Sequence, residues 1–143
     1  LIPNLTAVEN VDLPLIYRGV SRSVRQELSR EALKKVGLEH RMDHKPSEMS
    51  GGQQQRVAIA RAIAQAPPVI LADEPTGNLD SNSTKEIMDI LKGLHNEGRT
   101  VILITHDNDI AAQAKRVIKI KDGKVESDSG QIVPVEELQT AGA

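Results

Sequence analysis

Two adjacent carboxylates follow a short apolar run in the middle of the chain. Residues 69–72 are wholly apolar, and Asp73 and Glu74 come directly after them. Such a run predicts a buried parallel strand, whose carboxyl end lies at the sheet edge where open α/β folds bind ligands. Nucleotide hydrolysis needs one carboxylate near Mg²⁺ and a second that orients or deprotonates water. Neighbouring strand residues point to opposite sides, so Asp73 and Glu74 could divide these roles. A solvated acidic turn would carry the same pair.

A second candidate is the run Met49-Ser50-Gly51-Gly52-Gln53. Ser50 and Gln53 have the spacing of a capping box, in which the two side chains satisfy each other's backbone N–H groups. A helix start also offers free N–H groups and partial positive charge to an anion. Capping does not explain two consecutive glycines, because each weakens a helix by roughly 1 kcal/mol relative to Ala. We interpret Gly51 and Gly52 as residues that let a phosphate approach the backbone.

A histidine follows the next apolar run, Thr100 to Ile104, in the sequence Thr105-His106-Asp107. Taken alone, His106 is most simply an exposed loop residue. It follows the strand that comes after the carboxylate strand and its crossover helix, so we expect it at the same sheet edge as Glu74. There it could hydrogen-bond a phosphate or the attacking water.

Other polar groups are weaker candidates. His40 and His44 would have metal-ligand spacing only in a helix, and Pro46 predicts a loop there. Gly123-Lys124 resembles the end of a phosphate-binding loop. The G-x-x-x-x-G-K-[ST] pattern fails there because Ile118 and Val125 occupy required positions, and no such loop occurs in the sequence.

Apolar periodicity predicts the elements that must position these side chains. Helices are expected over residues 8–15, from 21 or 23 to 37, over 50–64, from about 83 to 96, and over 109–114. The buried face of the second helix would consist of Val24, Leu28, Ala32 and Val36, and that of the third of Val57, Ala60, Ile63 and Ala64. The fourth would begin at about Ser83, with Glu86 as its capping partner. Strands are expected over residues 69–72, 100–104 and 117–120, with a hairpin turn at Asp122-Gly123. This alternation predicts an α/β fold with parallel pairing.

Composition narrows the class of protein. Lys and Arg number 18 and Asp and Glu 20, so no basic field predicts nucleic acid as a partner. There is no cysteine, which excludes a disulfide framework. The first 50 residues contain no comparable strand. We therefore divide the chain into a helical region over 1–65, part of an α/β core over 66–126, and a tail over 127–143 with a weak helical signal at Val135 and Leu138.

Several ordered motifs make the sequence resemble the nucleotide-binding subunits of ABC transporters over nearly all of residues 1–126. The resemblance rests on these matches: Met49–Gln53 for the family signature, with Met for the usual Leu, Val69–Asp73 for the Walker B strand, Glu74 for the catalytic base, Asn78-Leu79-Asp80 for the D-loop, and His106 for the switch histidine. We call residues 49–53 the signature segment. Residues 1–11 and 73–81 most resemble the ATPases of lipoprotein-release and macrolide-export systems.

The resemblance implies a partial P-loop NTPase (RecA-like) core plus the ABC helical subdomain, acting on ATP with Mg²⁺. Two subunits would pair head to tail, and Ser50, Gly51, Gly52 and Gln53 would contact the γ-phosphate held by the other subunit. Asp73 would hold Mg²⁺ through water, Glu74 would activate the attacking water, His106 would steady the γ-phosphate, and Asp80 would link the two sites. Residues 15–50 would face a transmembrane permease subunit at the cytoplasmic face of the membrane.

The resemblance also places the Walker A lysine, the adenine-stacking aromatic residue and the Q-loop glutamine before Leu1. We therefore expect that residues 1–143 alone neither bind ATP tightly nor hydrolyse it. Uncovered sheet edges would favour self-association. Two alternatives stay open, a non-transport ABC ATPase of DNA repair or translation and a regulatory module without hydrolysis. The presence of both Glu74 and His106 argues against the second.

Overall fold

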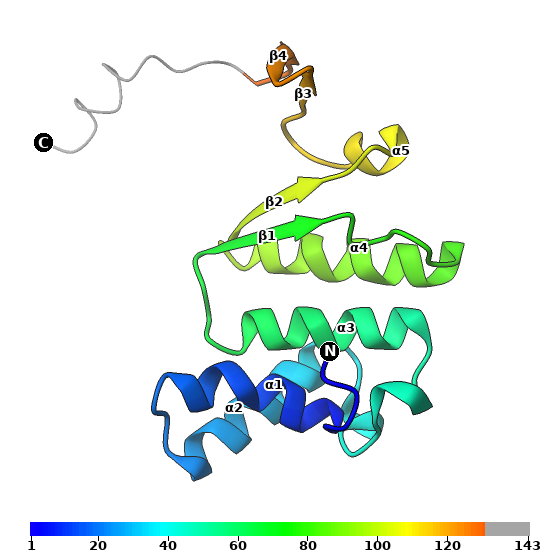
Figure 1. Ribbon diagram of the computed structural model, residues 1–143. Coiled ribbons are helices and arrows are strands. Elements are labelled where there is room, and N and C mark those ends of the chain that lie inside the picture. Colours follow the sequence, from blue (N-terminus) through cyan, green and yellow to red (C-terminus); the bar gives the residue numbers. More distant parts are fainter. Residues whose placement is uncertain (131–143) are drawn as a thin grey trace, which may run out of the picture. The chain divides into compact units, whose positions relative to one another are not determined.

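The computed structural model describes residues 1–130. Its elements, in chain order, are α1 (Ala7–Tyr17), α2 (Arg22–Lys35), the 3₁₀ turns η1 (Glu39–Arg41) and η2 (Pro46–Glu48), α3 (Gly51–Ile63), β1 (Val69–Asp73), α4 (Ser81–Asn96), β2 (Thr100–Ile104), α5 (Asn108–Ala111), β3 (Ile118–Lys121) and β4 (Lys124–Asp128) (Figure 1). They form two compact units, residues 1–104 and the chain from Thr105 onward. The predicted division after residues 65 and 126 stays a prediction. The helical signal at Val135 and Leu138 lies outside the described residues.

Helices α1, α2 and α3 pack on one another and enclose the larger core of the first unit. Its most deeply buried side chains are Val11, Leu15, Leu33, Val36, Leu38 and Val57. Helix α1 begins with a capping box, in which the Glu9 N–H donates to Thr6 Oγ1 and the Thr6 N–H donates to Glu9 Oε2. The predicted short helix over residues 8–15 is confirmed and extends slightly at both ends.

The buried face of α2 differs in part from the predicted one. Ala32 and Val36 are buried as expected, but Val24 is 48% exposed, and Leu33 and Ser29 are fully buried instead. A period read from apolar residues alone therefore misplaces the face by one position.

The remainder of the first unit is layered. Helix α4 packs against α3 on one side and against β2 on the other (Figure 1). Strands β1 and β2 are parallel, and their register runs from Val69 opposite Thr100 to Asp73 opposite Ile104. These two strands with their crossover helix confirm the predicted α/β fold and its parallel pairing.

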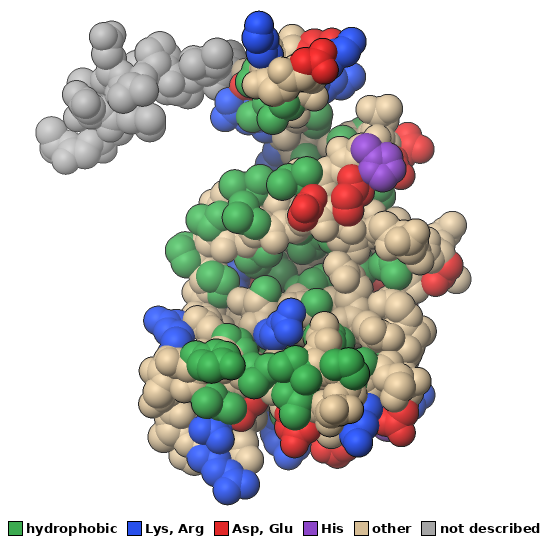
Figure 2. Space-filling view, viewed as in Figure 1, with side chains coloured by type: hydrophobic (Ala, Val, Ile, Leu, Met, Phe, Trp, Pro, Cys, Tyr) green, Lys and Arg blue, Asp and Glu red, His purple; other side chains and the backbone are tan. Residues whose placement is uncertain are grey.

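The expectation that β1 is fully buried is wrong. Ile70 is buried at 6% exposure, whereas Leu71 on the opposite face is 71% exposed. Val69, Ile102 and Ile104 are also exposed, and we call these three residues with Leu71 the open sheet face. Figure 2 shows hydrophobic side chains gathered over the two strands. Within residues 1–104, helices cover only one side of this sheet.

Helix α4 begins earlier than predicted. Asp80, and not a residue near Ser83, is its N-cap. Glu86 is not the capping partner that the spacing suggested, because its carboxylate forms an ion pair with Arg56 of α3, 2.5 Å from Nη1. Capping geometry at Asp80 therefore overrides the Ser83–Glu86 pattern.

The second unit contains α5 and a hairpin. Helix α5 ends at Ala111, short of the predicted residue 114. Strand β3 pairs antiparallel with β4, as the predicted hairpin requires. The predicted turn is confirmed, since Asp122 and Gly123 both have positive φ values of 49° and 73°, as a type I′ turn requires. Arg116 forms an ion pair with Asp128 and, as the leading cause, lowers the pKa of that carboxyl to about 2.

Candidate functional site

The signature segment forms the start of α3, as the sequence predicts. Ser50 is the N-cap, and the Gln53 N–H donates to its Oγ at 3.3 Å. In return the Ser50 N–H donates to Gln53 Oε1 at 3.0 Å. This capping box defines the helix start, and Val57, Ala60, Ile63 and Ala64 are buried as predicted.

The turn before Ser50 is fixed from both sides. Gln54 Nε2 donates to the carbonyls of Pro46 at 3.0 Å and Met49 at 3.1 Å. The Met49 side chain is buried in the core. Farther back, the Ala7 N–H at the start of α1 donates to the His44 carbonyl at 2.8 Å. Hydrogen bonds to backbone carbonyls, together with the buried Met49 side chain, therefore hold the signature segment and the turn before it against helices α1 and α3.

The first backbone N–H groups of a helix have no acceptor inside that helix. The capping box satisfies Gln53, but Gly51 and Gly52 donate their N–H groups to no acceptor among residues 1–130. The helix start also carries partial positive charge. The arrangement can therefore donate two backbone hydrogen bonds to an anion, with the exposed Ser50 beside them.

The two glycines have different surroundings. A Cβ on Gly51 would lie 3.4 Å from Leu79 Cδ2, which is ordinary contact. A Cβ on Gly52 would lie 2.6 Å from Ser83 Oγ and 2.8 Å from Ser83 Cβ, far inside contact distance. A side chain at position 52 would therefore require Ser83, in the first turn of α4, to shift.

Asp80 organises this first turn of α4. Its Oδ1 accepts the N–H groups of Asn82 at 3.0 Å and Ser83 at 2.9 Å, and its Oδ2 accepts the Ser83 hydroxyl at 2.7 Å. The Ser83 N–H is the main cause of a lowered Asp80 pKa, followed by the Ser83 hydroxyl. Asp80 is thus a charged cap. Its proposed link to a second subunit stays a prediction.

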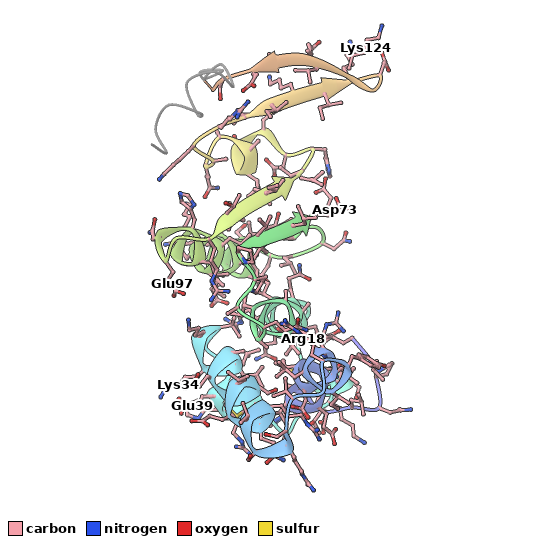
Figure 3. All side chains as sticks on the ribbon, turned by 90° about the vertical axis from the view of Figure 1, so that its left-hand side faces the viewer. Arg18, Lys34, Glu39, Asp73, Glu97 and Lys124 are labelled. Carbon is pink, nitrogen blue, oxygen red and sulfur yellow. The ribbon has the colours of Figure 1, made fainter. Side chains whose placement is uncertain are left out.

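Asp73 and Glu74 lie at the carboxyl end of β1. Figure 3 labels Asp73 at the arrowhead of this strand, where it is exposed. Glu74 is half-buried and leaves the strand with φ of 43°, a conformation that is rare for a residue with a Cβ. Such strain collects at functional sites. The sequence pattern places Glu74 correctly but does not reveal its strained backbone.

A tight turn leads from Glu74 to α4. The Gly77 N–H donates to the Glu74 carbonyl at 3.1 Å, and the Leu79 N–H donates to the Thr76 carbonyl at 3.3 Å. Asn78 has φ of 63°, which Asn tolerates better than most residues. This turn connects the carboxylates of β1 to Leu79 and Ser83, the residues that contact the two glycines of α3.

His106 lies in the second unit. It is exposed, and its neighbour Asp107 caps α5 by accepting the N–H groups of Asp109 and Ile110. Within the first unit, Leu79 and Ser83, which follow the turn after Glu74, lie against Gly51 and Gly52 of the signature segment. The convergence of His106 with Glu74 stays a prediction.

The donor set fits Mg²⁺ only in part. No three His, Cys, Asp or Glu side chains within residues 1–130 come together to form a metal site. Mg²⁺ is usually held by one or two carboxylates together with substrate phosphates and water. An exposed Asp73 at a sheet edge can supply one such carboxylate, and phosphate oxygens must supply further ligands. The end of β1 at Asp73 therefore fits a nucleotide-bound Mg²⁺ better than a cation held by protein ligands alone.

Ser83 is the site residue that the sequence analysis missed. Its signal was present in Asp80-x-x-Ser83, which is a capping pattern with the acidic residue first. The Ser83–Glu86 spacing instead predicts a helix start near Ser83 and leaves Asp80 in the preceding loop. The contact with Gly52 is tertiary and has no signature in local spacing.

Comparison with known proteins agrees with this arrangement. Residues 1–77 match the ABC transporter family. The chain is 56% identical over 131 residues to the macrolide export ATP-binding/permease protein MacB 2 of Aeromonas hydrophila, covering 92% of this chain and 20% of that protein. It is 53% identical over 140 residues to MacB of Photorhabdus laumondii, covering 98% and 22%. The chain thus spans about a fifth of the length of these curated relatives.

Two solved structures are also similar. The dimeric ATP-binding cassette MJ0796 in a post-hydrolysis state with ADP and Pi matches with a TM-score of 0.76 and 49% identity, over 90% of this chain and 57% of that chain. Another dimeric structure of MJ0796, described as a bacterial ABC transporter cassette, matches with a TM-score of 0.77 and 50% identity over the same shares. Within residues 1–130, no helix combines the length and apolar character needed to cross a membrane. Since the family match covers more than half of the chain, the protein belongs to the ABC transporter family.

Proposed function

We propose that the chain is part of the ATP-hydrolysing subunit of an ABC transporter of the macrolide-export type. One observation carries this proposal. The turn that leads from Glu74 into α4 contacts both signature glycines, through Leu79 at Gly51 and Ser83 at Gly52. The hydrolytic carboxylate and the phosphate-binding helix start are therefore parts of one packed structure. The names of the relatives in Aeromonas and Photorhabdus support the export type.

Each site residue has a role in this proposal. MgATP supplies the phosphoryl group that water attacks. Glu74 accepts the proton of the attacking water, and Asp73 holds Mg²⁺ through a water molecule. In a head-to-tail dimer, Ser50, with the N–H groups of Gly51 and Gly52, donates hydrogen bonds to the γ-phosphate bound by the second subunit. The positive end of α3 favours the same negative charge.

Three residues complete the proposed site. Gln53 holds Ser50 in place through the capping box and lies beside the phosphate. His106 steadies the γ-phosphate, and Asp80 links the two sites across the dimer while it caps α4. Residues 15–50 would contact a permease subunit, which would hold the ATPase at the cytoplasmic face of the membrane as a peripheral subunit.

Hydrolysis by the full-length protein that contains this chain tests the proposal. We expect the purified protein to hydrolyse MgATP and Glu74→Gln to lower kcat by about 10²–10⁴-fold, because an amide cannot accept the proton. ATP binding should persist in this variant. Glu97→Gln is the matched control, since Glu97 pairs with Lys35 away from the site and should leave kcat unchanged.

Two results would contradict the proposal. A Glu74→Gln variant that hydrolyses ATP at the normal rate would remove Glu74 from the mechanism. A wild-type protein that binds MgATP without hydrolysing it would instead favour a regulatory module. In membrane vesicles, stimulation of hydrolysis by a macrolide would support the export type, and hydrolysis that no macrolide alters would favour an ABC ATPase with another task.

A further inference from the structure

Helices α3 and α4 run side by side in the same direction (Figure 1). Their starts meet at Gly52 and Ser83. One turn farther along, Arg56 of α3 forms an ion pair with Glu86 of α4. The start of the signature helix therefore rests directly on the first turn of α4, and the ion pair supports the same helix pair at a second point.

The contact at Gly52 leaves no room for another residue. A Cβ there would lie 2.8 Å from Ser83 Cβ, and that distance is independent of the Ser83 rotamer. Rotation of Ser83 Oγ would also break its 2.7 Å hydrogen bond to Asp80 Oδ2. The Ser83 backbone is held in addition by its N–H bond to Asp80 Oδ1. Ser83 is thus fixed in position where it packs against the first turn of α3.

We propose that Ser83 is a positioning residue for the signature segment, and that Gly52 is glycine because Ser83 lies against it. The inference rests on the proposed function, in which the signature segment contacts a phosphate. It assigns the two glycines separate tasks. Gly51, which meets only Leu79 at an ordinary distance, remains the glycine with room for a ligand. Asp80 then acts on the signature segment of its own subunit, through Ser83.

The structure also supplies a compensating substitution. Beyond the Ser83 side-chain atoms, the next atom near a Cβ on Gly52 is Ser83 Cα at 3.8 Å, which is ordinary contact. Replacing Ser83 by glycine therefore makes room for alanine at position 52. If Ser83 is the reason for Gly52, the two substitutions must interact strongly.

The test compares four variants of the full-length protein, Gly52→Ala, Ser83→Gly, the double variant Gly52→Ala/Ser83→Gly, and Glu86→Gln. Melting temperature, kcat and KM for ATP are measured for each. We expect Gly52→Ala to lower kcat by at least about tenfold and to lower the melting temperature. The added Cβ would overlap Ser83, so α3 or α4 would have to shift at this contact. The double variant should match Ser83→Gly in both quantities.

Ser83→Gly alone should lower kcat by roughly threefold or more while KM for ATP changes less than about twofold, because Ser83 positions the segment without touching nucleotide. Glu86→Gln is the control for loosening of the same helix pair. It should lower the melting temperature and leave kcat within about twofold, since that ion pair lies beyond the signature segment.

Each contrary result overturns the inference. A double variant no better than Gly52→Ala in kcat would mean that the ligand, and not Ser83, requires Gly52. Full kcat in Ser83→Gly would show that Ser83 is not a positioning residue. If Glu86→Gln lost as much kcat as Ser83→Gly, the effect of the Ser83 substitution would be one of general stability. If wild type hydrolyses no ATP, the proposed function fails, and non-additive melting temperatures still decide whether Ser83 and Gly52 are coupled.

Discussion

The Glu74 N–H donates to the Ile104 carbonyl at 2.9 Å, so the ladder between β1 and β2 continues one residue beyond the strand. At that residue the backbone turns to φ of 43°. The parallel sheet therefore holds the proposed catalytic residue through its main chain in a conformation that its own Cβ disfavours. The strain lies in the backbone of Glu74 and is separable from its carboxylate chemistry.

This separation predicts that Glu74→Gly raises the stability of the fold while it abolishes hydrolysis. A left-handed residue with a Cβ is strained by about 1–2 kcal/mol, and the added freedom of glycine in the unfolded chain offsets about 0.5–1 kcal/mol of the gain. The melting temperature should rise by about 2–5 °C. Ala66, with φ of 50°, is the matched control. Ala66→Gly should give a similar rise and normal hydrolysis, and a fall in melting temperature for Glu74→Gly would contradict the account.

Ser50 caps α3, and in the proposed function it also donates to a phosphate. Ser50→Ala should lower the free energy of unfolding by about 1 kcal/mol, whereas Ser50→Gly should lower it by only a few tenths. Both variants lack the hydroxyl, so both should lose hydrolysis to a similar extent. Urea unfolding and steady-state kinetics on the pair check this. Activity that follows stability, with Ser50→Gly close to wild type, would leave Ser50 with a capping task only.

Stability near Asp80 should depend on pH in one direction. Its pKa is lowered below the ordinary 3.8 by the Ser83 N–H first and the Ser83 hydroxyl second. A carboxylate with a lowered folded pKa stabilises the fold above pH 3.8, and this contribution is lost as pH falls through the folded pKa. Asp80→Asn should therefore lower the melting temperature at pH 6, and its difference from wild type should shrink toward pH 2.

Asp89→Asn provides the comparison for that experiment. Asp89 is an exposed carboxylate in the middle of α4, where it is not the N-cap. Its substitution should change the melting temperature little at either pH. A difference between Asp80→Asn and wild type that stays constant from pH 6 to pH 2 would show that the charge of Asp80 does not contribute.

The open sheet face predicts self-association of residues 1–143. Its apolar side chains, and the outer edges of β1 and β2 that pair with no other strand within residues 1–130, favour pairing with another surface. Leu71→Lys, at the most exposed position of that face, should shift light-scattering masses toward monomer. Val24→Lys on α2 replaces an exposed apolar residue elsewhere and should not. A wild-type chain that stays monomeric over a wide concentration range would contradict this prediction.

The parts of the fold that local rules govern could be predicted from the sequence. The capping box of Ser50 and Gln53 and the Asp122-Gly123 turn depend on residues within a few positions of one another, and both are confirmed. The carboxylates after β1 were located by the apolar run before them. These signals suffice to place the signature segment on a helix start and Glu74 at a sheet edge.

The remainder depends on contacts between elements. The exposure of Leu71 depends on which helices cover the sheet. A wholly apolar run does not predict which face of its strand is covered. The contact of Ser83 with Gly52 joins two helices that no local spacing relates. Two glycines at a helix start suggested a single cause, close approach of a phosphate, whereas the structure gives Gly52 a neighbour in its own chain.

Calorimetric titration of residues 1–143 with MgATP shows whether this chain can bind the nucleotide without a phosphate-binding loop. The chain contains the signature segment and the proposed hydrolytic carboxylates, but its sequence contains no G-x-x-x-x-G-K-[ST] loop to cradle the β- and γ-phosphates. We expect no stoichiometric binding by this chain alone, whereas the full-length Glu74→Gln protein should bind MgATP. Binding of one MgATP per chain with micromolar affinity would contradict this expectation.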